Sequence, residues 1–208
     1  MKSCENCKHG EWSRNVDLQI PAMCIDCKYI EKGGLKVTSN WKPILQTNAD
    51  RIRAMSDEEL AELFQPILRE HGVETSDELA GKAAGIMKER MTLTTDMWDL
   101  TSFFFVAPTE YEEKLAKKQW KGDNPTMLGK LRGVLEGIED FSKENTETVV
   151  RAWLEAEGYS LGQVMNTLRL ALVGAGKGPG MFDVTEFIGK EECLKRIDTI
   201  LATLKPLE

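Results

Sequence analysis

Residues 160–182 have the sequence SLGQVMNTLRLALVGAGKGPGMF, which contains clear local signals for a helix and for its end. Its first half predicts a helix, because a Ser160/Gln163 capping box precedes apolar residues at helical spacing. The glycines of 174–180 then predict a helix stop and a turn, since glycine accepts the backbone conformations that end helices. The sequence IGKEE follows at 188–192, and a last helix is expected to begin near Lys190.

Helical signals continue upstream to Ser56. Ser56 and Glu59 form a second capping box, Pro125 occupies the first position of a helix, and Gly158 ends another. No strand pattern of period two appears after residue 50, so the fold class is mainly α. Helices are expected at about 56–71, 76–90, 95–105, from a capping box at 109–112, at 124–141, 144–157 and 160–173, and from about 190.

The bulk composition is that of an ordinary globular protein. Of the 208 residues 41% are hydrophobic and 29% are charged, and the net charge is −7. This charge argues against a wholly basic nucleic-acid-binding domain but leaves room for a local basic face. No apolar run is long enough to cross a bilayer and no signal peptide is evident, so a cytoplasmic protein without membrane contact is expected.

Four cysteines near the N-terminus have the spacing of a metal site. Cys4, Cys7, Cys24 and Cys27 follow the pattern C-x2-C-x16-C-x2-C. Four thiolates suit the tetrahedral coordination of zinc and leave no open position, which favours a structural zinc ion over a catalytic one. Two disulfides or four unrelated thiols remain as alternatives. We therefore expect a zinc-ribbon-like module at 1–46, followed by a linker and the start of the first helix at 47–63.

The signature at the start of this section belongs to a longer pattern. The sequences LRLALVG at 168–174, GPGMF at 178–182 and GKEE at 189–192 follow KERMTL at 88–93 and the aromatic stretch 98–105. Residues 64–205 thereby resemble the C-terminal anticodon-binding domain of bacterial glutamyl-tRNA synthetases. The resemblance implies two helical subdomains, at 64–142 and 143–208, that surround the anticodon loop of tRNA-Glu.

The resemblance also implies the residues of the site. Arg169 matches the arginine of the family that contacts the anticodon, and Arg90 matches the one that recognises the third anticodon base. Gly178, Pro179 and Met181 match the loop that packs on the first base. Unstacked anticodon bases expose edges and faces that a planar guanidinium can contact. Without the family, Arg169 would be an ordinary surface arginine of an amphipathic helix.

The segment before residue 62 resembles a different group of proteins. Its paired cysteines, the sequence NWKP at 40–43 and the stretch 47–61 are similar to small zinc-ribbon proteins of phages and prophages. Those proteins have no well-defined activity, so the likeness suggests an origin outside the synthetase family. Whether the zinc module has a protein partner stays open.

Two functions from different classes remain. Synthetase chemistry needs an H-x-G-H-type motif and a KMSKS-type loop; His9 and His71 lie in no such motif, so no independent catalysis is expected. In the first hypothesis, the chain is an anticodon-loop-binding fragment of a glutamate–tRNA ligase joined to a structural zinc module. In the alternative, it is a phage-derived zinc-binding adaptor whose helical tail mediates protein–protein contact without binding RNA.

Overall fold

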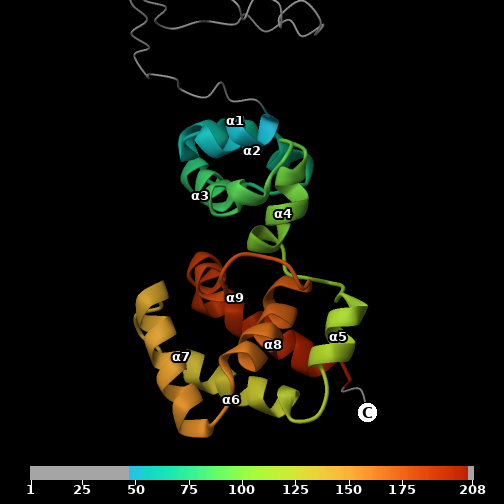
Figure 1. Cartoon of the computed structure of the whole chain (residues 1–208), viewed down its shortest axis with the longest axis vertical. Helices are drawn as coiled ribbons and strands as arrows, with labels where there is room; N and C mark the ends of the chain where they lie inside the picture. The colour runs from blue at the N-terminus through green and yellow to red at the C-terminus, as the bar shows by residue number, and fades with distance from the viewer. Residues whose placement is uncertain (1–46, 206–208) are drawn as a thin grey trace, which may run out of the picture. The chain divides into compact units, whose positions relative to one another are not determined.

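The computed structural model describes residues 47–205, which belong to a compact unit at Pro43–Glu208. All regular secondary structure in this range is helical, which confirms the mainly α class (Figure 1). The predicted zinc ligands lie outside the described residues. The helices are α1 (Asn48–Ala54), α2 (Asp57–Glu70), α3 (Asp77–Met87), the short 3-10 helix η2 (Lys88–Arg90), α4 (Asp96–Phe105), α5 (Glu113–Gln119), α6 (Asn124–Glu136), α7 (Lys143–Glu157), α8 (Leu161–Val173) and α9 (Met181–Thr203).

Two of the three predicted capping boxes begin a helix at the expected place. At α2 the Ser56 hydroxyl accepts the Glu59 amide, and the Glu59 carboxylate accepts the Ser56 amide, so the box is complete. At α8 the Ser160 hydroxyl accepts the Gln163 amide at 3.3 Å. The Gln163 side chain donates instead to Asn124 Oδ1 at 2.6 Å, which leaves this box half formed.

The third predicted capping box, at 109–112, is wrong. Helix α5 begins only at Glu113, and its N-cap residue Glu112 makes no capping bond through its side chain. That carboxylate accepts the backbone amide of Gly176 at 2.8 Å. A contact between segments far apart in the chain therefore replaces the local cap.

The last helix is longer than expected. Helix α9 begins at Met181 rather than near Lys190, and residue 189 interrupts it with φ 77° and ψ 167°. The predicted helix is thus the second half of α9, at 190–203. Helix α6 ends at Glu136 and not near Phe141, because the chain turns at Gly137.

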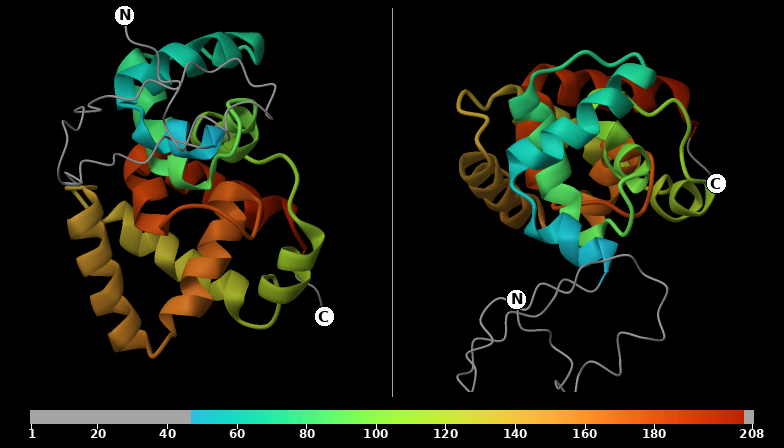
Figure 2. Two further views of the ribbon diagram at one scale, coloured as in Figure 1. Left: turned by 45° about the horizontal axis from the view of Figure 1, so that its top comes forward. Right: turned by 90° about the horizontal axis from the view of Figure 1, so that it is seen from above.

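The helices pack as two groups, which we call the first helical group (α1–α4) and the second helical group (α5–α9). In the first, α3 packs on both α2 and α4; in the second, α6, α8 and α9 contact one another (Figures 1 and 2). Helix α6 packs on α8 and α9 within the second group, and the expected subdomain boundary at 142/143 stays a prediction. The core includes Leu60, Phe64, Leu68, Ala84, Met87, Leu128, Leu131, Leu135, Leu168, Ile197 and Ile200.

The first half of α9 joins the two groups. The Phe187 ring lies 4.4 Å from Phe104 and 5.7 Å from Phe105, measured between ring centroids. Next to it, Glu186 pairs with Lys82 of α3 at 3.7 Å and accepts the Lys143 amide at the start of α7 at 3.2 Å. These contacts fix the residues that follow the 174–180 loop against the end of α4.

Candidate nucleic-acid interface

The loop at 174–180 is tied to the segment that connects α4 to α5. The Glu112 amide donates to the Gly174 carbonyl oxygen at 2.7 Å, and the Gly176 amide donates to the Glu112 carboxylate at 2.8 Å. One residue thus satisfies a donor and an acceptor of the loop. Sequence reasoning missed Glu112, since nothing in the sequence marks a pairing across more than sixty positions.

Arg169 reaches this loop from the last turns of α8. Its side chain is half-buried, and Nη2 donates to the Pro179 carbonyl oxygen at 2.7 Å. Nη1 is buried without a hydrogen-bond partner. A Cβ atom at Gly178 would lie 2.6 Å from Nη1, so the close approach of the guanidinium depends on glycine at that position.

Arg90 reaches the same loop from the first helical group. It lies at the end of η2, its side chain is exposed, and Nη1 donates to the Gly178 carbonyl oxygen at 2.5 Å. The structure therefore brings together four of the five predicted site residues: two arginines from different groups bind adjacent carbonyls of one loop.

Met181, the fifth predicted site residue, is separate from this cluster. It is the first residue of α9, and only 3% of it is exposed because it belongs to the hydrophobic core. Pro179 is also buried, and the exposed residues of the loop are Gly176, Lys177 and Gly180. In this conformation Met181 stabilises the turn and offers no side chain to a ligand.

The two guanidinium groups form a positive cluster. Burial lowers the pKa of Arg169, and the charge of the neighbouring Arg90 lowers it further. Arginine nevertheless stays charged at neutral pH. Among residues 47–205, neither arginine pairs with a carboxylate, whereas Arg132 and Arg151 both do. Unneutralised guanidinium forks at a loop suit the binding of a phosphate or a base edge.

The described residues include neither a candidate metal site nor a candidate membrane span. Between residues 47 and 205, no three His, Cys, Asp or Glu side chains are grouped so that they could hold a metal ion. None of the helices in that range is long and apolar enough to cross a membrane.

The described residues form an all-helical domain in which two guanidinium groups meet at one loop. The family model described as an anticodon binding domain matches residues 59–201, and the chain belongs to this family. Its relatives identify the match more closely as the anticodon-binding domain of glutamyl-tRNA synthetases. The glutamate–tRNA ligase of Phocaeicola vulgatus is 50% identical over 158 residues, which are 76% of this chain and 31% of that protein.

A solved structure supports the same assignment. The glutamate tRNA ligase from Elizabethkingia meningosepticum, crystallised in complex with its amino acid, superposes with a TM-score of 0.72 at 39% identity. The match covers 76% of this chain and 31% of that one. The chain thus spans about a third of the length of the relatives that it matches.

One alignment extends toward the N-terminus. The glutamate–tRNA ligase of Bacteroides fragilis is 43% identical over 199 residues, which cover 93% of this chain and 39% of that protein. An alignment of this extent includes residues before position 47. It weighs against a separate origin for the first sixty residues, and it leaves the zinc hypothesis untested.

Proposed function

We propose that this chain binds the anticodon loop of tRNA-Glu and supplies the RNA-recognition part of a glutamate–tRNA ligase, without its chemistry. Arg169 contacts an anticodon base or phosphate in this proposal, and Arg90 contacts a neighbouring nucleotide. Gly178 leaves room for the guanidinium of Arg169, and the backbone of the loop lies beside both.

One observation carries the proposal: two arginines from separate helical groups meet at the Gly178 and Pro179 carbonyls with no carboxylate partner among the described residues. A structural arginine is normally paired with an acid, because a half-buried charge is costly when it is left uncompensated. A polyanionic RNA loop would supply the missing negative charge. Its unstacked bases would also offer edges to the planar forks.

The test is a titration of labelled tRNA-Glu and of a non-cognate tRNA at two salt concentrations. We expect tighter binding of tRNA-Glu and weaker binding at the higher salt, since phosphate contacts release counterions. Arg169→Ala should weaken tRNA-Glu binding by about tenfold, which corresponds to the loss of one charge-assisted contact. Arg151→Ala on α7 is the matched control, because it removes an exposed, ion-paired arginine.

Negligible binding of both tRNAs would overturn the proposal and would favour the alternative, an adaptor whose helices contact another protein. Equal losses in the Arg169→Ala and Arg151→Ala variants would also overturn it. In that case the affinity would come from the total charge and not from the arginine cluster.

For the segment at 1–46 we propose one structural zinc ion bound by Cys4, Cys7, Cys24 and Cys27. The support is the spacing of the cysteines alone, which suits a closed tetrahedral site. Metal analysis of the purified chain should find one zinc per chain, and Cys4→Ser together with Cys24→Ser should abolish it. Finding no zinc in the unaltered chain would refute this proposal without affecting the tRNA proposal.

A further inference from the structure

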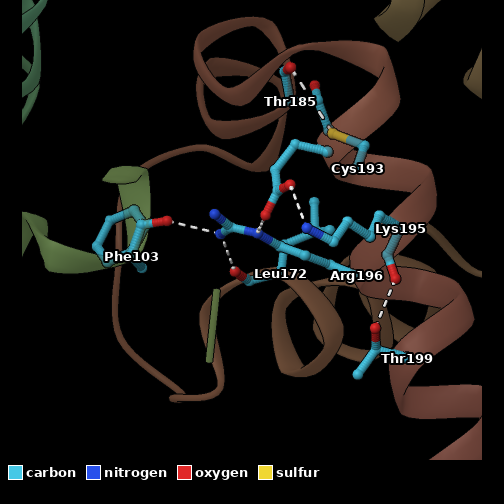
Figure 3. A network of polar contacts seen from close by, with 8 residues as sticks. Phe103, Leu172, Thr185, Cys193, Lys195, Arg196 and Thr199 are labelled. Carbon is cyan, nitrogen blue, oxygen red and sulfur yellow. Dashed lines mark hydrogen bonds and ion pairs between the residues drawn. The ribbon is translucent and has the colours of Figure 1, made fainter. Parts of the chain in front are cut away.

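Arg196 is a buried arginine in the second half of α9. Only 2% of the residue is exposed. Its Nη1 donates to two carbonyl oxygens, that of Phe103 at 2.6 Å and that of Leu172 at 2.8 Å, and its Nε pairs with Glu192 at 2.8 Å (Figure 3). One guanidinium thus joins the ends of α4 and α8 to α9.

The two carbonyl oxygens belong to groups that helices leave without a partner. The last four carbonyls of a helix accept no intrahelical bond, and the negative end of the helix dipole lies there. Neither α4 nor α8 has a basic residue in its last turn. Arg196 provides the positive charge for both ends, and Glu192 compensates that charge in the interior.

The position of these two helix ends matters for the arginine cluster. Phe103 lies in the last turn of α4, just before the connecting segment 106–112, and Leu172 lies in the last turn of α8, just before the loop 174–180. The two segments contact each other through Glu112, and the loop carries the Gly178 and Pro179 carbonyls. A shift of either helix end would therefore move the loop relative to Arg90.

We infer that Arg196 is the positioning residue of the interface: it fixes the end of the first helical group to the end of α8, so that Arg90 and Arg169 meet at one loop. It acts through the loop, because it is too buried to touch RNA. The expected effect of Arg196 on RNA binding rests on the proposed function. Its effect on the position of the 174–180 loop does not.

The first test needs no RNA. Amide hydrogen exchange would be compared among the unaltered chain, Arg196→Met and Arg196→Lys, at a temperature well below unfolding. We expect the Glu112 and Gly176 amides to exchange about tenfold faster in both variants, since they lose the support of the joined helix ends. The Gly158 amide, which ends α7 elsewhere, should be unchanged.

Arg132→Met is the matched control. Arg132 also pairs with α9, through Asp198 at 2.9 Å, but it joins α6 to α9 within the second helical group. This variant should leave the Glu112 and Gly176 amides protected. If Arg196→Met does not fold, Arg196→Lys keeps a charge near both carbonyls and tests the same point. Unchanged Glu112 and Gly176 exchange in a folded Arg196 variant would overturn the inference.

The second test links Arg196 to the interface. In the unaltered chain, Arg90→Ala should weaken tRNA-Glu binding by about tenfold. In the Arg196→Lys background it should weaken binding by less than about twofold, because Arg90 no longer meets the loop. If Arg196→Lys only destabilised the domain, Arg90→Ala would still weaken tRNA-Glu binding by about tenfold in that background. The same loss of about tenfold is expected in the Arg132→Met background. If the unaltered chain binds no tRNA, the proposed function fails, while the exchange experiment still decides the role of Arg196.

Discussion

Arg90 and Arg169 form an arrangement that is costly without a ligand. Their guanidinium groups donate to neighbouring carbonyls, and Arg169 Nη1 is buried with no partner. An unsatisfied buried donor loses its hydration without regaining a hydrogen bond. Burial and the charge of Arg90 both lower the pKa of Arg169, which reports the same cost. In the proposed function, the negative charge of the RNA would offset part of the cost of these two positive charges.

The close approach of the Arg169 guanidinium to the loop depends on the glycine at 178. In Gly178→Ala the new methyl group would lie 2.6 Å from Arg169 Nη1, so the guanidinium must move. The end of an arginine is flexible, and we expect a stability loss of less than about 1 kcal/mol but a clear shift of the Arg169 side-chain NMR signal. Gly162→Ala, where nothing lies within 4 Å, is the control. An unmoved Arg169 signal would contradict the dependence on glycine.

Cys193 gives a prediction about pH. Burial raises the pKa of its thiol from 9.0 to about 12. Because the folded pKa is the higher one, the thiol contributes stability below about pH 9 and loses that contribution as the pH rises toward 12. The unfolding free energy of the chain, measured in urea, should therefore fall relative to that of Cys193→Ala by up to roughly 1.4 kcal/mol per pH unit in this range. A difference in unfolding free energy between the two proteins that stays constant from about pH 9 to about pH 12 would show that folding does not raise the pKa of the thiol.

At the scale of helices, the interruption of α9 is the feature with the greatest consequence. Before the break, Phe187 packs on Phe104 of α4. After it, Arg196 contacts Leu172 of α8 and Phe103 of α4, and Asp198 pairs with Arg132 of α6. Residue 189 changes the direction of the chain, and Lys190 donates to the Ile138 carbonyl oxygen at 2.8 Å just after the break. The first half of α9 thus follows the 174–180 loop, and after the break at residue 189 the helix continues into the core of the second helical group.

A side chain at 189 should destabilise the domain through the backbone alone. Gly189 has φ 77° and ψ 167°, a combination that essentially only glycine adopts, and nothing lies within 4 Å of an added Cβ, so Gly189→Ala should cost about 1–3 kcal/mol through the backbone. Gly133→Ala makes the same change within α6, also in open space, and should be stabilising because alanine favours a helix. Thermal unfolding of the two variants measures the contrast. Equal shifts of the unfolding temperature in the two variants would contradict the positive φ of Gly189.

At the scale of the whole described domain, the proposed interface lies where the two helical groups meet. Arg90 belongs to one group and Arg169 to the other, and Phe187 and Arg196 both contact α4 from α9. The recognition surface is therefore a property of the packing between the groups. Loss of that packing should separate the arginines even if every helix still forms.

Phe187→Ala tests this dependence. The variant removes an aromatic contact between the groups and should cost roughly 2 kcal/mol, less than a fully buried phenylalanine. Hydrogen exchange should rise more at α2 than at α8, because the first helical group loses its support. Phe141→Ala, another half-buried phenylalanine that lies in the second group, should not show this bias. Equal increases in hydrogen exchange in both groups after Phe187→Ala would contradict the dependence of the first helical group on this contact.

Much of the helix pattern could be predicted because its causes are local. Ser56 and Ser160 cap the amides of their own first turns, and Gly158 and Gly174 end the helices that they follow. The failures at 109–112 and at 181–188 have a shared reason. Glu112 is taken by the Gly176 amide, and residues 181–188 are helical where they pack on α4. Neither partner is near in sequence.

The sequence alone predicted the helical class and the family resemblance, and that resemblance implied the five candidate site residues. The tertiary structure was needed to show that Arg90 meets Arg169 at one loop, that Met181 lies in the core, and that Arg196 joins two helix ends. Helix caps and hydrophobic periodicity depend on residues that are close in the sequence, so they can be predicted from it. The convergence of charges from positions 90, 169 and 196 depends on packing between distant segments, and no local pattern specifies that packing.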